Sequence, residues 1–168
     1  MTADQTIAAS FVLKTYTIAA SAGVGGTIDP TGDVVVSCGA SKTFTITPGA
    51  CYDIADVLVN GSSVGAVASY EFTNVTADQT IAASFVIKTY TLATSVTGGG
   101  SLTILPDLPA YGCGASVEIS ALADAGWQFD HWTGSASGSA NPLTLIMTGD
   151  KSVTAVFVDI APPSVTVI

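Results

Sequence analysis

The chain has 168 residues, a net charge of −9, and four lysines as its whole complement of basic residues. So few cations cannot neutralise a nucleic-acid backbone or an anionic membrane surface, which excludes both as partners. Hydrophobic residues make up 48% of the chain and charged residues 10%, unlike a disordered chain. No apolar run approaches the roughly 18 residues of a membrane helix, so the apolar residues must be spread over many short strands.

The chain contains an internal repeat. Residues 2–21 and 76–95 are identical at 17 of 20 positions with an offset of 74, and residues 148–158 are a weaker third copy. Repeats at a fixed spacing indicate modules built from one supersecondary unit. We therefore expect four segments along the chain: an orphan closing strand of a preceding repeat (1–14), a first β module (15–87), a second β module (88–158), and a linker or the start of a further domain (159–168).

The elements expected in chain order are all strands. Residues 2–13 form an apolar strand, and residues 43–47 alternate threonine with Phe44 and Ile46. Asn60-Gly61 is a strong signal for a two-residue hairpin turn, and residues 79–85 place Ile81 and Phe85 on one face. The sequence therefore predicts an all-β fold of two tandem small-sheet modules with an extra N-terminal strand.

Three phenylalanines occupy the same place in the three copies of the closing strand, namely Phe11, Phe85 and Phe157. Strand alternation predicts that the last two point into the module cores. The further core residues that we expect are Phe44, Phe72, Trp127 and Phe129.

The second module carries a resemblance to a known family. It reads Y-T-L, G-G-G-S-L, Y-G-C-G-A-S, A-G-W-Q-F-D-H-W-T-G and D-K-S-V-T-A-V-F in order. It resembles the divergent internalin-B-type B-repeat family of bacterial secreted and surface proteins. The first module resembles a variant of that family, with Cys51 and Val57 where the family has glycine and tryptophan. The resemblance implies grasp-like sheets, an extracellular or cell-surface location, a role in adhesion or as a spacer, and neither catalytic residues nor a cofactor.

The three cysteines suggest one bridge. Cys38 and Cys113 are equivalent by repeat, whereas the counterpart of Cys51 is Gly126. We expect a Cys38–Cys51 disulfide and a free thiol at Cys113, as suits an oxidising compartment. Closing this short loop would contribute roughly 3 kcal/mol. The alternative is three reduced, buried cysteines in a cytosolic protein.

The aromatic residues of the second module allow two interpretations. Trp127, Trp132 and Tyr111 lie close to Phe129 in the pattern. If exposed, the first three would form a platform on which a sugar ring stacks. If the pattern is the core signature of the module, they are buried instead.

Polar residues give no catalytic or metal site. Regular alternation would put His131 on the face of Phe129, opposite Asp130, but no nucleophile motif accompanies this pair. Paired aspartates, Asp29 with Asp33 or Asp53 with Asp56, lack the loop pattern of a calcium site. The acids are better explained as the solvating charge of a secreted surface.

The sequence therefore predicts a non-enzymatic extracellular repeat segment that serves adhesion or acts as a structural spacer. Two alternatives remain: a self-assembling fibre subunit that uses strand addition, and a glycan-binding module. The expected partners are neighbouring repeats, copies of the chain itself, or cell-surface or wall glycan. Residues 2–13 either fold back onto the first module or pair with a neighbouring copy, and residues 162–168 resemble the opening strand of another domain.

Overall fold

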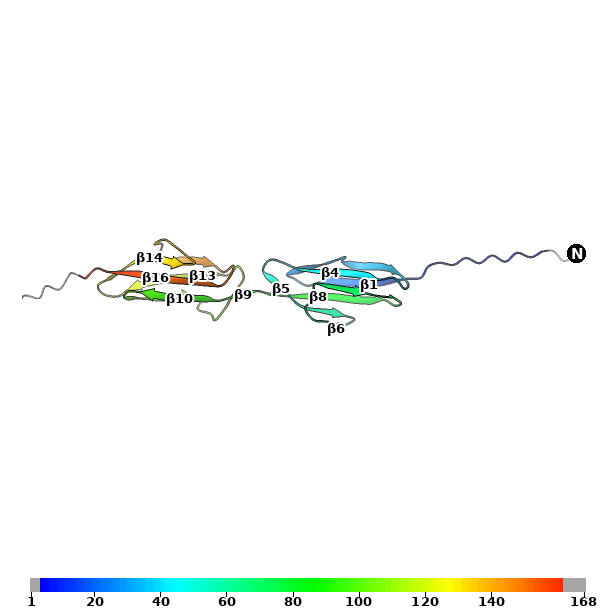
Figure 1. The fold of residues 1–168 in the computed structure, drawn as a ribbon, viewed down its shortest axis with the longest axis horizontal. Helices are drawn as coiled ribbons and strands as arrows, with labels where there is room; N and C mark the ends of the chain where they lie inside the picture. The colour runs from blue at the N-terminus through cyan, green and yellow to red at the C-terminus, as the bar shows by residue number, and fades with distance from the viewer. Residues whose placement is uncertain (1–3, 162–168) are drawn as a thin grey trace, which may run out of the picture. The chain divides into compact units, whose positions relative to one another are not determined.

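The computed structural model describes residues 4–161, and these contain strands, turns and loops but no helix. The all-β fold predicted from the sequence is confirmed. The chain divides into two compact units, with the boundary between Val86 and Ile87 (Figure 1).

Unit 1 contains two sheets. Its strands are β1 (Thr15–Ala22), β2 (Gly26–Asp29), β3 (Gly32–Ser37), β4 (Lys42–Pro48), β5 (Tyr52–Val59), β6 (Ser62–Ser63), β7 (Ser69–Phe72) and β8 (Gln79–Ile87). One sheet has the order β3-β1-β8-β5-β6 and the other β2-β4-β7. The opening strand β1 and the closing strand β8 are parallel neighbours, and β3 pairs antiparallel with the other edge of β1.

A single cluster of buried side chains joins the two sheets of unit 1. Ile18 of β1, Ile81 of β8 and Val57 of β5 are fully buried, as is Phe44 of β4. These positions follow the alternation of each strand, which directs every second side chain into the space between the sheets.

Unit 2 has a similar arrangement, but the first of its sheets has three strands instead of five. Its strands are β9 (Thr89–Tyr90), β10 (Leu92–Thr97), β11 (Gly100–Leu105), β12 (Tyr111–Gly112), β13 (Ser116–Ala123), β14 (Trp127–Gly134), β15 (Leu143–Ile146) and β16 (Lys151–Asp159). The sheets are β10-β16-β14, β11-β13-β15 and the short pair β9-β12. The closing strand β16 again lies beside the opening strand β10 in parallel. No long strand corresponds to β3 in the described part of unit 2.

The core prediction is half right. Phe44, Phe72 and Phe157 are buried. Phe85, Trp127 and Phe129 are half-buried, so the prediction of full burial is wrong for them. Phe85 packs against Gly26 and Trp127 against Gly98 and Gly99 at the edge of each core, and part of each ring remains in contact with water.

The extra N-terminal strand is not formed. Residues 4–14 adopt no strand, and Ile7 and Phe11 are 95% and 94% exposed. The prediction of a strand there is therefore wrong for the single chain, and of the two alternatives for this segment, folding back onto unit 1 is not observed. The nearly identical β8 is a strand because it lies between β1 and β5, whereas residues 4–14 have no such neighbours. The strand expected at residues 162–168 lies outside the described residues.

Candidate functional site

The described residues, 4–161, enclose no pocket and no group of three or more side chains that could hold a metal ion. They also contain no helix long and apolar enough to cross a membrane. Candidate functional features must therefore be sought in the repeated motifs and on the strand edges.

The aromatic residue that begins β5 in unit 1 and β14 in unit 2 lies on a glycine turn. A Cβ atom placed on Gly98 or Gly99 would come closer than 3.0 Å to the ring of Trp127. In unit 1, Tyr52 lies in the same way on Gly25. The G-G sequence is thus required because the ring occupies the space of a side chain, and Trp127 is used to close the end of the unit.

A β-bulge places Phe129 and Trp132 on the same inner face. Residues three apart on a regular strand point to opposite faces, but the pairing of β14 with β16 shifts register between Phe129 and His131. The two inner rings lie 4.9 Å apart between centroids. The indole N–H of Trp132 donates to the Ala140 carbonyl at 2.8 Å, and the ring is 1% exposed. The W-x-F-x-x-W spacing is therefore the signature of a bulged core strand.

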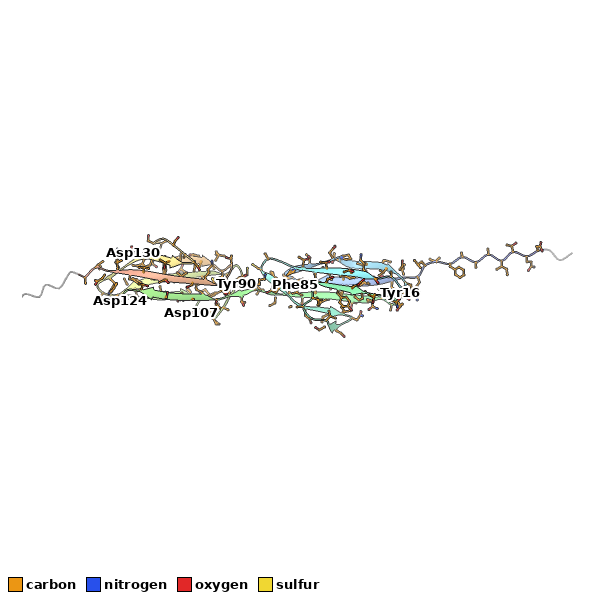
Figure 2. The ribbon with its side chains drawn as sticks, viewed as in Figure 1. Tyr16, Phe85, Tyr90, Asp107, Asp124 and Asp130 are labelled. Carbon is orange, nitrogen blue, oxygen red and sulfur yellow. The ribbon has the colours of Figure 1, made fainter. Side chains whose placement is uncertain are left out.

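The same bulge turns a charged pair toward water. His131 Nδ1 lies 2.8 Å from Asp130 Oδ2, and both side chains are substantially exposed (Figure 2 labels Asp130). An exposed pair of this kind contributes little to stability. Because the bulge breaks the alternation, His131 does not share the inner face of Phe129, contrary to the expectation from a regular strand.

Of the two interpretations of the aromatic residues in unit 2, the core interpretation is right for Tyr111 and Trp132. Trp132 and Tyr111 are buried, and the Tyr111 hydroxyl donates to the Pro106 carbonyl at 2.8 Å. Trp127 is half-buried against its glycine turn. The platform interpretation is wrong for Tyr111 and Trp132 because both rings fill the core of unit 2.

Each unit has an aspartate clamp that sequence reasoning missed. Asp150, just before β16, accepts hydrogen bonds from the Thr91 N–H at 2.7 Å and the Thr91 hydroxyl at 3.0 Å. These bonds, the backbone one foremost, hold the pKa of the Asp150 carboxyl below its ordinary value of 3.8. In unit 1, Asp78 accepts from the Thr17 N–H at 2.8 Å. The signal was the aspartate repeated in T-A-D and T-G-D before each closing strand.

The cysteine prediction is wrong in its pairing. Cys38 is an exposed free thiol, whereas Cys51 and Cys113 are each disulfide-bonded. The Cys38 N–H donates to the Lys14 carbonyl, immediately before β1. Cys51 precedes Tyr52, whose ring lies on Gly25 beyond the other end of β1.

The two sulfurs of the predicted bridge are therefore far apart. The eight residues of β1 span about 26 Å at roughly 3.3 Å per residue. A disulfide needs Cβ atoms within about 4.5 Å of each other. Cys38 and Cys51 are close in the sequence, but the chain crosses unit 1 between them, so sequence separation was a poor guide to their distance.

The model of the divergent InlB B-repeat domain matches residues 90–161. No curated protein and no solved structure matches the chain. The matched residues include the D-K-x-V-T-A-x-F closing strand, and the family that they match is one of small non-catalytic modules. Residues 90–161 are thus identified as a divergent InlB B-repeat domain, a module typical of bacterial surface proteins.

Proposed function

We propose that the chain is a non-enzymatic repeat segment of a bacterial surface or secreted protein, where it acts in adhesion or as a structural spacer. The observation that carries this proposal is the direct repetition of the module. The closing strand β8 ends at Ile87 and β9 begins at Thr89, so along the chain a single residue, Lys88, separates the last strand of one copy from the first strand of the next. A chain in which small modules follow one another in this way is suited to spacing.

The chemistry of the motifs supports the same proposal. The aromatic residues of the repeated motifs contact glycines of their own unit, and the aspartates accept hydrogen bonds from threonines of their own unit. The family match and the disulfide-bonded cysteines favour an oxidising, extracellular compartment. The partners that we propose are neighbouring repeats and cell-surface or wall glycan, with no nucleic acid and no inserted membrane segment.

Antibodies raised against the folded chain test its location. We expect them to label intact cells of the organism that makes the protein, or to detect it in the medium, as strongly as they label permeabilised cells. Labelling that requires permeabilisation contradicts a surface location. An antibody against a cytosolic protein is the control for cell integrity.

Retention on insoluble peptidoglycan separates adhesion from spacing. Beads coated with the full chain are compared with beads coated with an unrelated acidic protein of similar net charge. Specific retention supports adhesion to wall glycan, and equal retention of the two kinds of bead supports a spacer. Tyr111 and Trp132 are buried, so they do not offer an exposed aromatic platform for glycan binding.

A second candidate function is self-assembly by strand addition. Residues 5–13 carry no charged side chain, and Ile7, Phe11 and Val12 are each at least 94% exposed. Their sequence nearly duplicates β8, which forms a strand in unit 1. An extended apolar segment of this kind is suited to pairing with the open edge of a sheet.

A further inference from the structure

Unit 2 has an open sheet edge where unit 1 has a strand. In unit 1, β3 covers the outer edge of β1 from Thr15 to Ala20. In unit 2, β12 pairs only with Tyr90 and Thr89 of β9, and β10 lies at the edge of its sheet.

A proline-containing loop takes the place of the missing strand. The chain that would continue the pairing passes instead through the exposed residues 105–110. Pro106 and Pro109 in this loop have no N–H to donate, so the loop cannot replace β3. Figure 2 labels Asp107 of the loop and Tyr90 of β9.

The side chains beside this edge are less buried than their counterparts. Ile18 and Ala20 of β1 are 0% and 6% exposed. Leu92 and Thr94, which occupy the same positions of β10 by the offset of 74, are half-buried. In unit 1, Val34 pairs with Ile18 and packs against the core. Unit 2 thus lacks the strand that would cover the rim of its core.

The backbone at this edge is available for pairing. The Thr91 carbonyl accepts from the Lys151 N–H and so points to β16. Because successive residues of a strand direct their backbone groups to opposite edges, Leu92, Thr94 and Val96 direct theirs to the open edge. Exposed edge strands are usually protected from pairing by charged residues or proline. The strand L-A-T-S-V-T contains neither.

We propose that residues 5–13 of a second copy of the chain add to the open edge of β10. This inference rests on the second candidate function and names the surface that it uses. The alternation fits: with Ile7, Ala9 and Phe11 directed inward beside Leu92 and Thr94, the small residues Ala8 and Ser10 lie outward. The same alternation occurs in β8, where Ile81 and Ala83 are buried.

Neither the donor segment, residues 5–13, nor the acceptor strand β10 contains a charged residue. Their contact therefore avoids the electrostatic repulsion that a net charge of −9 imposes between other parts of two copies. The donor segment and the acceptor edge belong to different units of the chain. Addition is therefore heterologous and leaves each newly joined copy with a free donor or acceptor, which gives open, growing assemblies. Added salt promotes assembly because it screens the remaining repulsion.

Sedimentation velocity of the full chain tests the proposal. All proteins carry Cys38→Ser, because an exposed thiol would otherwise link copies by oxidation. We expect species whose size grows with protein concentration. Ala9→Pro, in the exposed donor segment, is expected to reduce the chain to a monomer without changing the urea midpoint.

Variants of two edge strands, β10 and β3, test the acceptor. Thr94→Pro removes an N–H from the edge of β10, and Val96→Lys adds a charge at a side chain that is 37% exposed. Both are expected to abolish assembly. Val35→Lys places the same charge on β3, an edge strand of unit 1, and is expected to leave assembly intact. Near-UV circular dichroism verifies that each variant is folded. If Thr94→Pro does not fold, Val96→Lys alone tests whether β10 is the acceptor strand.

The outcomes separate the two proposals. If Ala9→Pro abolishes assembly but Val96→Lys does not, the β10 acceptor is wrong while strand addition stands. The β10 acceptor is equally wrong if Val35→Lys is the edge variant that blocks assembly. If the Cys38→Ser chain is a monomer at every concentration, both the second candidate function and this inference are overturned.

Discussion

Asp150 accepts two hydrogen bonds from Thr91, although 59 positions separate the two residues in the chain. The contact joins the turn before the closing strand to the start of the opening strand. It therefore fixes the register in which β10 and β16 meet, just as Asp78 and Thr17 do between β8 and β1.

Replacing the clamp should weaken unit 2. Asp150→Ala leaves the Thr91 N–H without its carboxylate partner, so we expect the urea midpoint of unit 2 to fall. The fluorescence of Trp127 and Trp132, both in unit 2, reports this transition. Asp107→Ala, a change in an exposed loop, is the matched control and should leave the midpoint unchanged. Equal midpoints for Asp150→Ala and the wild type contradict the clamp.

The clamp also predicts how stability depends on pH. The pKa of Asp150 is lower in the folded chain than its ordinary value of 3.8, so the folded state favours the ionised carboxylate. Its stabilising effect is fully present above the ordinary pKa and is lost as the pH falls through the lower, folded-state pKa. We expect urea midpoints between pH 2 and pH 6 to show a smaller acid loss in Asp150→Asn than in the wild type. An identical pH profile for the two proteins argues against the linkage.

Gly99 should be irreplaceable because of the ring above it. A Cβ at this position would overlap the Trp127 ring, so Gly99→Ala must displace the ring or the turn. We expect a loss of about 1–3 kcal/mol in the free energy of unfolding. Gly149→Ala is the control, because a Cβ there meets nothing within 4 Å. Similar losses from the two substitutions, measured by urea unfolding, would show that the ring contact is not the cause.

The cysteines should differ in reactivity. Cys38 is exposed and free, so the native chain should react with one equivalent of a thiol reagent and Cys38→Ser with none. After reduction and unfolding, the wild-type chain should react with three equivalents, matching its three cysteines. Peptide mapping of the native reaction should find the label on Cys38. Label on Cys113 in the native protein contradicts the disulfide-bonded state.

Local rules predicted the strands and one turn well. Phe44 and Ile81 are buried as the alternation of their strands requires. Asn60 and Gly61 have φ angles of 49° and 79°, the left-handed geometry that an Asn-Gly hairpin turn uses. These features depend on neighbouring residues and can therefore be read from a short stretch of sequence.

The features that the sequence did not reveal depend on distant segments. The bulge that brings Phe129 and Trp132 to one face appears only when β14 is paired with β16. The positions of Cys38 and Cys51 depend on the direction in which the chain crosses unit 1. The exposure of Phe11 depends on whether a sheet edge is present beside it, which its own sequence does not specify.

The parallel pairing of the first and last long strands has a mechanical consequence. A pull that enters unit 1 through β1 and leaves through β8 draws these two strands past each other along their length. The load is then shared by all the registered pairs from Ile18–Gln79 to Ala22–Ala83, because none can open before the others. Unit 2 has the same geometry between β10 and β16. Forced unfolding is governed by the unfolding rate, so both modules are built to stay folded under tension along the chain.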